Sequence, residues 1–527
     1  MKNNENYFEF IVVGAGLAGI TAALEASKFG TVVLLTKTNL EIGNLFWAQG
    51  GIAAAIGDND SVDSHIYDTL TAGRGLCNKM AVEILADEGV QRVNELIKLG
   101  MPFEWDNGEI VVGSGAGHSH NRVLYSKGDS TGREIINFYI DIVRKNKNIK
   151  VVENSVVYHL IVENKICSGV YVYDCKNKNS FSLFGSSIIL ATGGASAIYQ
   201  QKTTPHSSIG EGISLAYNAG ADVENMEFIQ FHATAFASEN SNTFLISEKV
   251  LGAGAYLLNH EMNRFMIEND EAAELADRDV IAKSLFTELK RYHMPNAYLD
   301  LRHLDREIIR NQFSNIYDEA LKYGVDITAD LIPVAPAAYY NLGGIKTGVW
   351  GETNIKSLYA VGEAASSGVH GANKLAGNSL LECLVFTKRA VEHAVMNKKE
   401  NIPLATEMID YSVNENRLSW FNKIKNQVAM IMMNNVGVVR IQEELNSAIN
   451  KLSMLRENIP ADENEYYANS AINIVNVALL ITTSALIREE SRGCHFRDDF
   501  TSEEEKKYTI IQNKFSGLKV TEIIDES

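Results

Sequence analysis

The sequence predicts an α/β protein: a Rossmann-like domain interrupted by an α+β capping domain and followed by a C-terminal helical bundle. Three observations lead to this prediction. A strand, a glycine-rich turn and a helix follow one another at the N-terminus, and two later strand-like runs also end in glycine. After Pro403 the glycines thin out and apolar residues recur at helical spacing. The 527 residues are enough for three or four domain-sized units.

Composition and charge narrow the classes of function. Hydrophobic residues make up 46% and charged residues 22%, which is ordinary for a globular protein. The net charge of −18 repels nucleic acid and anionic membrane surfaces, so neither is expected as a partner. We find no run of about 18 uncharged apolar residues and no signal-peptide pattern, so we expect a cytoplasmic protein. The five cysteines are never spaced C-x-x-C, which predicts buried thiols and no metal centre.

The N-terminal motif has the context of a nucleotide-binding turn. A β-rich run covers residues 7–13, G-A-G-L-A-G covers 14–19, a helical pattern runs to Ser27, and a second β run covers 31–35. In such a βαβ unit the glycines let the backbone approach a pyrophosphate, and the helix N-terminus offers N–H donors. The acidic residue that usually binds ribose after the second strand is replaced by Thr36 and Lys37. Plain NAD binding is therefore disfavoured.

Later signals suggest how the domains are arranged. Two buried-strand runs, 188–191 and 358–361, end in T-G-G and G-E, and Asn378 and Ser379 precede a helical pattern that runs to Ala390. Because the strand and glycine signals stop and then resume, we expect a discontinuous domain of residues 1–225 and 343–403. Residues 226–342 would form the capping domain. Residues 404–527 would be helical, with apolar spacing over 441–455 and another helix over about 465–488.

Longer motifs carry a family resemblance. Together with the glycine turn, N-L-F-W-A-Q-G-G-I-A-A-A from Asn44 resembles the succinate dehydrogenase and fumarate reductase flavoprotein family, and most closely its L-aspartate-oxidising branch. Further similar segments are D-S-H-I-Y-D-T-L-T-A-G from residue 63, G-H-S-H-N-R-V-L from 117, E-F-I-Q-F-H from 227, L-A-D-R-D-V from 275, H-G-A-N-K-L-A-G-N-S from 370 and E-S-R-G-C-H-F from 490. The similar segments run in order from about residue 7 to about residue 500.

The resemblance implies FAD as the cofactor of the Rossmann-like domain. The FAD would be non-covalent, because Asn44 stands where members with covalent flavin carry His. Glu363 would hold the sugar-alcohol chain, with a helix-capping carboxylate as the alternative. The helix that starts at Asn378 would stabilise the reduced ring through its dipole. The implied cofactor contacts are Gly14, Ala15, Gly16, Leu17, Ala18, Gly19, Lys37, Asn44, Leu45, Phe46, Trp47, Ala48, Gln49, Gly50, Gly51, Glu211, Glu363, Asn378, Ser379 and Leu380.

The resemblance also implies a reaction, in which L-aspartate is oxidised to iminoaspartate by hydride transfer to flavin N5. Dioxygen or fumarate would reoxidise the flavin, and the imine would feed quinolinate and NAD synthesis, with quinolinate synthase as the implied coupled partner. Arg278 is implied as the proton-transferring group, against the alternative of a surface charge. His232 is implied as a substrate-carboxylate ligand, against the alternative of a core histidine. Ser247, Glu248, Tyr339 and Lys374 are the further implied substrate contacts.

Several positions depart from the L-aspartate-oxidising pattern. Gly115 stands in place of Glu, Leu251 and Ala253 replace the charges of R-G-E-G, Tyr339 replaces His, and Lys374 replaces Arg. Lys cannot grip a carboxylate with the planar fork of Arg, and one lost charge-assisted bond costs about 1.5–3 kcal/mol. Two alternatives therefore stay open: a flavin reductase or dehydrogenase of another small carboxylate, and a flavoprotein with a degenerate site that serves as an assembly or regulatory partner.

Overall fold

The structure is a computed structural model. It describes residues 6–40, 50–128, 130–238, 243–247, 249–398, 411–460, 462 and 464–523. The predicted cofactor contacts from Asn44 to Gln49, and the predicted substrate contact Glu248, lie outside the described residues.

The main sheet has the strand order β8-β2-β1-β11-β10-β9, with β18 paired to β11. Its parallel part consists of β8 (Ile149–Val152), β2 (Val32–Leu35), β1 (Tyr7–Val13), β11 (Asn179–Leu190) and β18 (Leu358–Ala360). The strands β9 (Ser155–Glu163) and β10 (Ile166–Asp174) complete it antiparallel. All four residues of β2 are buried and apolar, as expected for a parallel sheet covered on both faces.

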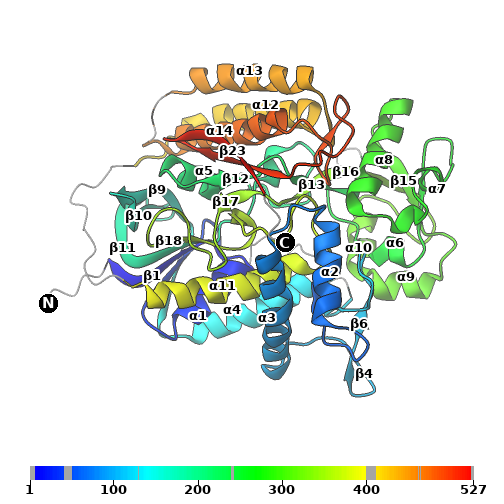
Figure 1. The fold of residues 1–527 in the computed structure, drawn as a ribbon, viewed down its shortest axis with the longest axis horizontal. Helices are drawn as coiled ribbons and strands as arrows, with labels where there is room; N and C mark the ends of the chain where they lie inside the picture. Colours follow the sequence, from blue (N-terminus) through cyan, green and yellow to red (C-terminus); the bar gives the residue numbers. More distant parts are fainter. Residues whose placement is uncertain are drawn as a thin grey trace.

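Helices cover both faces of this sheet (Figure 1). Below it in that view lie α1 (Leu17–Ala26), α3 (Lys79–Lys98), α4 (Thr131–Lys145) and α11 (Asn378–Met396), and α1 packs against both α4 and α11. Above it lies α5 (Glu211–Asn218), which contacts β9 and β17 (Gly344–Lys346). Because β18 returns to the sheet after a long excursion, the Rossmann-like layer takes strands from two separated parts of the chain.

The excursion contains the predicted α+β capping unit, drawn in green in Figure 1. Its sheet has the order β13 (Ile229–Phe236), β16 (Ile332–Asn341), β15 (Ala297–Asp300) and β14 (Tyr256–Leu258). The helix α8 (Arg278–Tyr292) packs on β13 and β16. Four shorter helices complete the described part of the unit: α6 (Lys249–Gly252), α7 (Met266–Asn269), α9 (Arg306–Gln312) and α10 (Ser314–Leu321). Every residue of β13 is buried, which fixes this sheet against the rest of the protein.

The C-terminal region is helical, as predicted, and also contains a hairpin. Three helices pack together: α12 (Leu418–Asn435), α13 (Gln442–Asn458) and α14 (Tyr466–Ile487). After them, β22 (Tyr508–Asn513) and β23 (Gly517–Glu522) form a hairpin, and β22 pairs with β12 (Val223–Glu224). The last described strands therefore belong to a sheet that also includes β17.

The sequence-based statement about apolar runs was wrong for α14. This helix is uncharged over its 22 residues and is the one described helix that is long and apolar enough to cross a membrane. However, 72% of its apolar window is buried inside the protein, where it packs on α5, α12 and α13. A helix that is apolar on all sides is expected in such a core.

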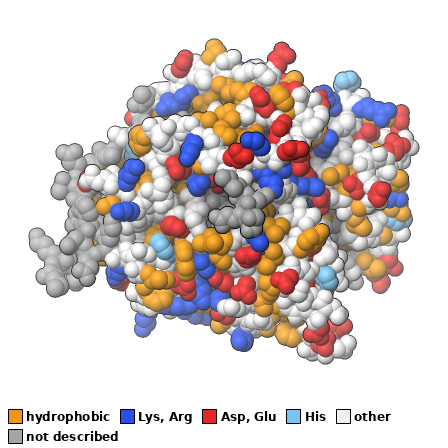
Figure 2. All heavy atoms as spheres, viewed as in Figure 1, with side chains coloured by type: hydrophobic (Ala, Val, Ile, Leu, Met, Phe, Trp, Pro, Cys, Tyr) orange, Lys and Arg blue, Asp and Glu red, His pale blue; other side chains and the backbone are white. Residues whose placement is uncertain are grey.

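The thiols match the prediction only in part, and the surface carries charges of both signs. Cys167, Cys383 and Cys494 are buried as predicted and Cys77 is half-buried, but Cys175 is exposed at the end of β10, where the buried-thiol prediction was wrong. Acidic and basic side chains are interspersed over the face shown in Figure 2.

Candidate active site

A cavity of about 710 Å³ extends between the main sheet and the capping unit. Its volume lies in the range of small-molecule and cofactor sites. The described cofactor contacts that line it are Gly14, Ala15, Gly16, Leu17, Ala18, Lys37, Gly50, Gly51, Glu211, Glu363, Ser379 and Leu380. The described substrate contacts that line it are His232, Ser247, Arg278, Tyr339 and Lys374. Of the predicted residues that the structure describes, all except Gly19 and Asn378 thus line this one cavity.

The glycines of the N-terminal turn have different roles. Gly14 has φ +107°, and a Cβ there would lie 2.1 Å from the Ala191 carbonyl oxygen. A Cβ at Gly19 would lie 1.9 Å from the Gly14 oxygen, so Gly19 serves close packing and does not line the cavity. A Cβ at Gly16 would meet nothing within 4 Å, and Gly16 is the N-cap of α1. The turn therefore leaves open space where a phosphate can reach helix N–H groups.

Lys37 replaces the usual acidic residue and forms an ion pair with Glu211. Its Nζ donates to the two carboxylate oxygens of Glu211 at 2.9 and 2.8 Å. Burial alone would lower the pKa of Lys37, but the nearby charge of Glu211, with a smaller contribution from Tyr466, outweighs it and raises that pKa. Ser470 from α14 adds a hydrogen bond to Glu211 at 3.3 Å. Lys37 and Glu211 therefore pair with each other in the cavity wall.

Glu363 follows β18 and faces the backbone of two other segments. One carboxylate oxygen accepts the Asn341 N–H at 3.0 Å, and a Cβ at Gly194 would lie 2.3 Å from the same oxygen. These contacts cross between segments, so they do not support the alternative of a helix cap. Burial raises the pKa of Glu363 to about 7, although the Asn341 and Gly194 N–H groups and the charge of Lys374 act in the opposite direction.

Asn378 does not line the cavity. Its Oδ1 lies 2.8 Å from His65 Nε2, and its Nδ2 donates to Thr69 Oγ1 at 2.9 Å. Both partners belong to α2 (Val62–Ala72), so the Asn378 side chain fastens the start of α11 to α2. The next two residues, Ser379 and Leu380, line the cavity at the N-terminus of α11.

Three predicted site residues, His232, Arg278 and Lys374, lie around the ring of a fourth, Tyr339. The His232 ring centroid lies 5.6 Å from that of Tyr339, and the Arg278 guanidinium carbon lies 5.7 Å from it. Lys374 Nζ lies 5.3 Å from the same ring, and both His232 and Lys374 are almost fully buried, at 3% and 2% exposure. Because two cations share one aromatic ring, this part of the cavity suits an anion.

Arg278 is the first residue of α8, and its two acidic neighbours are held from outside the capping unit. Arg74 Nη2 lies 2.9 Å from Asp277 and 3.5 Å from Asp279. The Arg74 carbonyl oxygen in turn accepts a hydrogen bond from Arg492 at 2.8 Å. The first turn of α8 is therefore fastened to the C-terminal region through Arg74.

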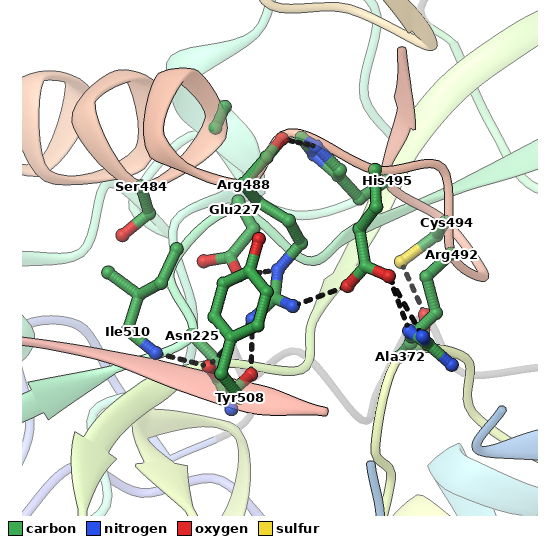
Figure 3. A network of polar contacts seen from close by, with 12 residues as sticks. Asn225, Glu227, Ala372, Ser484, Arg488, Arg492, Cys494, His495, Tyr508 and Ile510 are labelled. Carbon is green, nitrogen blue, oxygen red and sulfur yellow. Dashed lines mark hydrogen bonds and ion pairs between the residues drawn. The ribbon is translucent and has the colours of Figure 1, made fainter. Parts of the chain in front are cut away.

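The segment E-S-R-G-C-H-F belongs to a buried ionic network (Figure 3). Arg488 Nε contacts Glu227 at 2.6 Å, its Nη1 contacts Glu490 at 2.7 Å, and Arg492 contacts Glu490 at 2.8 Å. Cys494 N donates to the Ala372 carbonyl oxygen at 2.9 Å, two residues before Lys374. The network thus joins the start of the capping unit to the loop that carries Lys374.

Sequence reasoning missed several lining residues, among them His118, Tyr125 and Lys249. His118 Nε2 lies 2.8 Å from the Ala376 carbonyl oxygen, and burial lowers the pKa of His118 to about 4, so its ring stays neutral near pH 7. The signal for His118 was present in the G-H-S-H segment. Lys249 Nζ lies 4.8 Å from the Tyr125 ring centroid, and it directly follows the predicted contact Glu248.

Comparisons with known proteins identify the class. A family model described as "FAD binding domain" matches residues 9–380, and one described as "Fumarate reductase flavoprotein C-term" matches residues 425–515. The solved quinol fumarate reductase FrdA of E. coli is 26% identical, with a TM-score of 0.90 over 99% of this chain and 97% of that one. Sdh1 of Mycobacterium smegmatis is 27% identical, with a TM-score of 0.83 over 98% and 94% of the two chains. The protein is thus an FAD-binding flavoprotein of the succinate dehydrogenase and fumarate reductase type.

Curated relatives narrow the family further. L-aspartate oxidase 1 of Ralstonia nicotianae is 39% identical over 94% of this chain and 95% of its own length. L-aspartate oxidase of Yersinia pestis is 36% identical over 97% and 99%, and that of Synechocystis is 37% identical over 96% and 97%. The chain belongs to the L-aspartate oxidase family.

Proposed function

We propose that this protein oxidises L-aspartate to iminoaspartate. The observation that carries the proposal is the convergence of His232, Arg278 and Lys374 on Tyr339, in the same cavity as the glycine turn that begins at Gly14. Bound FAD supplies the hydride acceptor. The fit of the site to FAD is supported by the open backbone at Gly16 and by the cavity volume of about 710 Å³.

In this proposal the protein's own residues bind and orient the substrate. Lys374 and His232 hold a carboxylate, and Tyr339 fills the space between them and Arg278. Arg278 moves the proton at the reacting carbon when the reaction runs as a reduction of fumarate. Ser247 and Glu248 are proposed as further substrate contacts. The FAD would be held non-covalently by residues that include Lys37, Glu211 and Glu363.

The reoxidant and the fate of the product are also proposals. Dioxygen or fumarate would reoxidise the flavin, and the imine would pass to a quinolinate synthase for NAD synthesis in the cytoplasm. The domain limits 1–225 with 343–403, 226–342 and 404–527 are proposed on the same basis. The return of β18 to the main sheet, where it pairs with β11, supports a discontinuous first domain.

A second candidate function is the reduction or dehydrogenation of another small carboxylate. It is favoured by the uncharged wall at Gly115, Leu251 and Ala253, all of which line the cavity. At Gly115 an added Cβ would lie 2.9 Å from the His118 ring, so a longer side chain there would require movement of that ring. The positive charges of this site therefore come from residues other than these three.

Anaerobic titration of the flavin absorbance tests both functions. L-aspartate should bleach the oxidised flavin of the wild type, whereas bleaching only by another carboxylate or amine would favour the second candidate. Bound FAD that no such compound reduces would indicate a degenerate site. Arg278→Lys should lower fumarate-reducing turnover by about 10² to 10⁴ at unchanged FAD content. Acid precipitation should release the yellow colour into the supernatant if the FAD is non-covalent.

A further inference from the structure

We propose that Lys249 is the anchor for the second carboxylate of the substrate, and that it selects dicarboxylates over monocarboxylates. This inference rests on the proposed function and adds to it a residue that the motifs did not indicate. Lys249 begins α6 in the capping unit and lines the same cavity as Arg278 and Lys374. It is the one lysine of the capping unit among the described cavity-lining residues.

The position of Lys249 is set by Tyr125 from the Rossmann-like domain. The Lys249 ammonium lies 4.8 Å from the Tyr125 ring centroid, a contact that holds a cation over an aromatic face. The same ring packs on Gly51, because a Cβ added there would lie 3.1 Å from Tyr125 Cδ1. Gly51 belongs to the segment that the motifs assign to the cofactor. The ammonium is therefore held beside the cofactor segment, across the boundary between the two units.

Cations from both units line the cavity. Among the described lining residues, Lys37 and Lys374 come from the Rossmann-like domain, and Lys249 and Arg278 come from the capping unit. Lys37 forms an ion pair with Glu211 at 2.8 Å.

The other acidic groups of the described wall are already engaged. Glu274 forms an ion pair with Arg264 at 2.7 Å, and Glu363 accepts the N–H of Asn341. A dicarboxylate would place one carboxylate at Lys374 and His232 and the other at Lys249, all three of which line the cavity.

The experiment compares Lys249→Gln and Lys249→Arg with wild type, and Lys290→Gln serves as the control. Lys290 is an exposed lysine in the last turn of α8, also in the capping unit. The first measurement is the Kd of succinate, a dianion that lacks the amine, read from the change in the absorbance of bound FAD. The second is the ratio of kcat/KM for L-aspartate to that for L-asparagine, whose side-chain amide is neutral and of similar shape.

Loss of one charge-assisted contact should raise the succinate Kd and the L-aspartate KM at least tenfold in Lys249→Gln. It should lower the aspartate-to-asparagine ratio by a similar factor, because asparagine makes no ion pair to lose. Lys249→Arg should keep most of the ratio, and Lys290→Gln should match wild type. Wild-type values in Lys249→Gln for all three quantities would overturn the inference.

The same data separate the inference from the proposed function. If L-aspartate fails to bleach the wild-type flavin, the proposed function fails, but a succinate Kd that depends on Lys249 would still support the anchor. If L-aspartate is oxidised normally and Lys249→Gln changes neither the succinate Kd nor the ratio, only the anchor is refuted. Failure of wild type to bind succinate at millimolar concentration would also refute the anchor.

Discussion

Replacing Arg488 by Met should destabilise the protein far more than replacing a surface arginine in an equally short ion pair. The side chains of Arg488, Glu227 and Glu490 are all 0% exposed. Without Arg488, Glu490 would keep its bonds to Arg492 and to the Glu504 N–H. Glu227 would lose its ion-pair partner, and its other oxygen already makes no hydrogen bond among the described residues.

The expected loss of stability follows from the difference between breaking a buried ion pair and breaking an exposed one. Breaking a buried pair while one charge remains costs about 3–5 kcal/mol, because the remaining ion is left without compensation. An exposed pair is worth about 0–1 kcal/mol. Arg302 provides the comparison, because it contacts Asp300 at 2.8 Å with 47% of its side chain exposed.

Urea titration of the FAD-saturated protein, followed by circular dichroism, measures the effect. Since a chain of several domains need not unfold in two states, midpoints rather than extrapolated free energies should be compared. Arg488→Met should lower the midpoint several times more than Arg302→Met. Adding Glu227→Gln should recover part of the loss, because a buried neutral amide costs less than a buried carboxylate. A midpoint for Arg488→Met equal to that of Arg302→Met, or no recovery in the double variant, would refute the reasoning.

Three more outcomes are expected. Gly14→Ala should abolish folding or FAD binding, because the added Cβ would meet a carbonyl oxygen at 2.1 Å. Gly16→Ala should fold normally and weaken FAD affinity. Thermal melting measures the folding of both variants, and flavin fluorescence measures their FAD binding. Arg74→Gln should lower kcat about tenfold with little change in KM, because it releases the turn that carries Arg278; Arg74→Lys should restore part of the rate, and an unchanged kcat would count against this role. Burial lowers the pKa of His65 to about 4. The unfolded chain therefore binds a proton below pH 6.5 that the folded protein does not accept, so stability should fall by up to about 3 kcal/mol between pH 6.5 and 4, and His65→Gln should flatten this slope.

Elements with strong local signals could be predicted closely from the sequence. The run predicted over 7–13 is β1, Tyr7–Val13, and the helix predicted to Ser27 is α1, Leu17–Ala26. The helix predicted over about 465–488 is α14, Tyr466–Ile487. Residues at their ends help to fix the backbone: Gly14, directly after β1, has φ +107°, and the Glu465 side chain caps α14 at the Ala468 N–H.

Features that depend on distant partners could not be predicted in this way. The place of the β22–β23 hairpin in its sheet is set by the pairing of β22 with β12. The Asn378 side chain faces α2 rather than the cavity because His65 and Thr69 offer it two hydrogen bonds. In both cases the deciding partner lies more than 250 residues away, and no local pattern encodes it.

The substrate side of the site shows the same dependence on distant contacts. At the single positions 251 and 253, a comparison of sequences shows that charged residues have been replaced by Leu251 and Ala253. The cavity is nevertheless still lined by Lys249, Arg278 and Lys374. A cation contributes to an anion site through its distance and burial, not through its place in a motif. Lys249 is held by Tyr125 from another unit, and Arg278 is positioned through Arg74. The recognition of a dicarboxylate can therefore persist while the motif changes, provided that the contacts between the units keep three positive charges around one cavity.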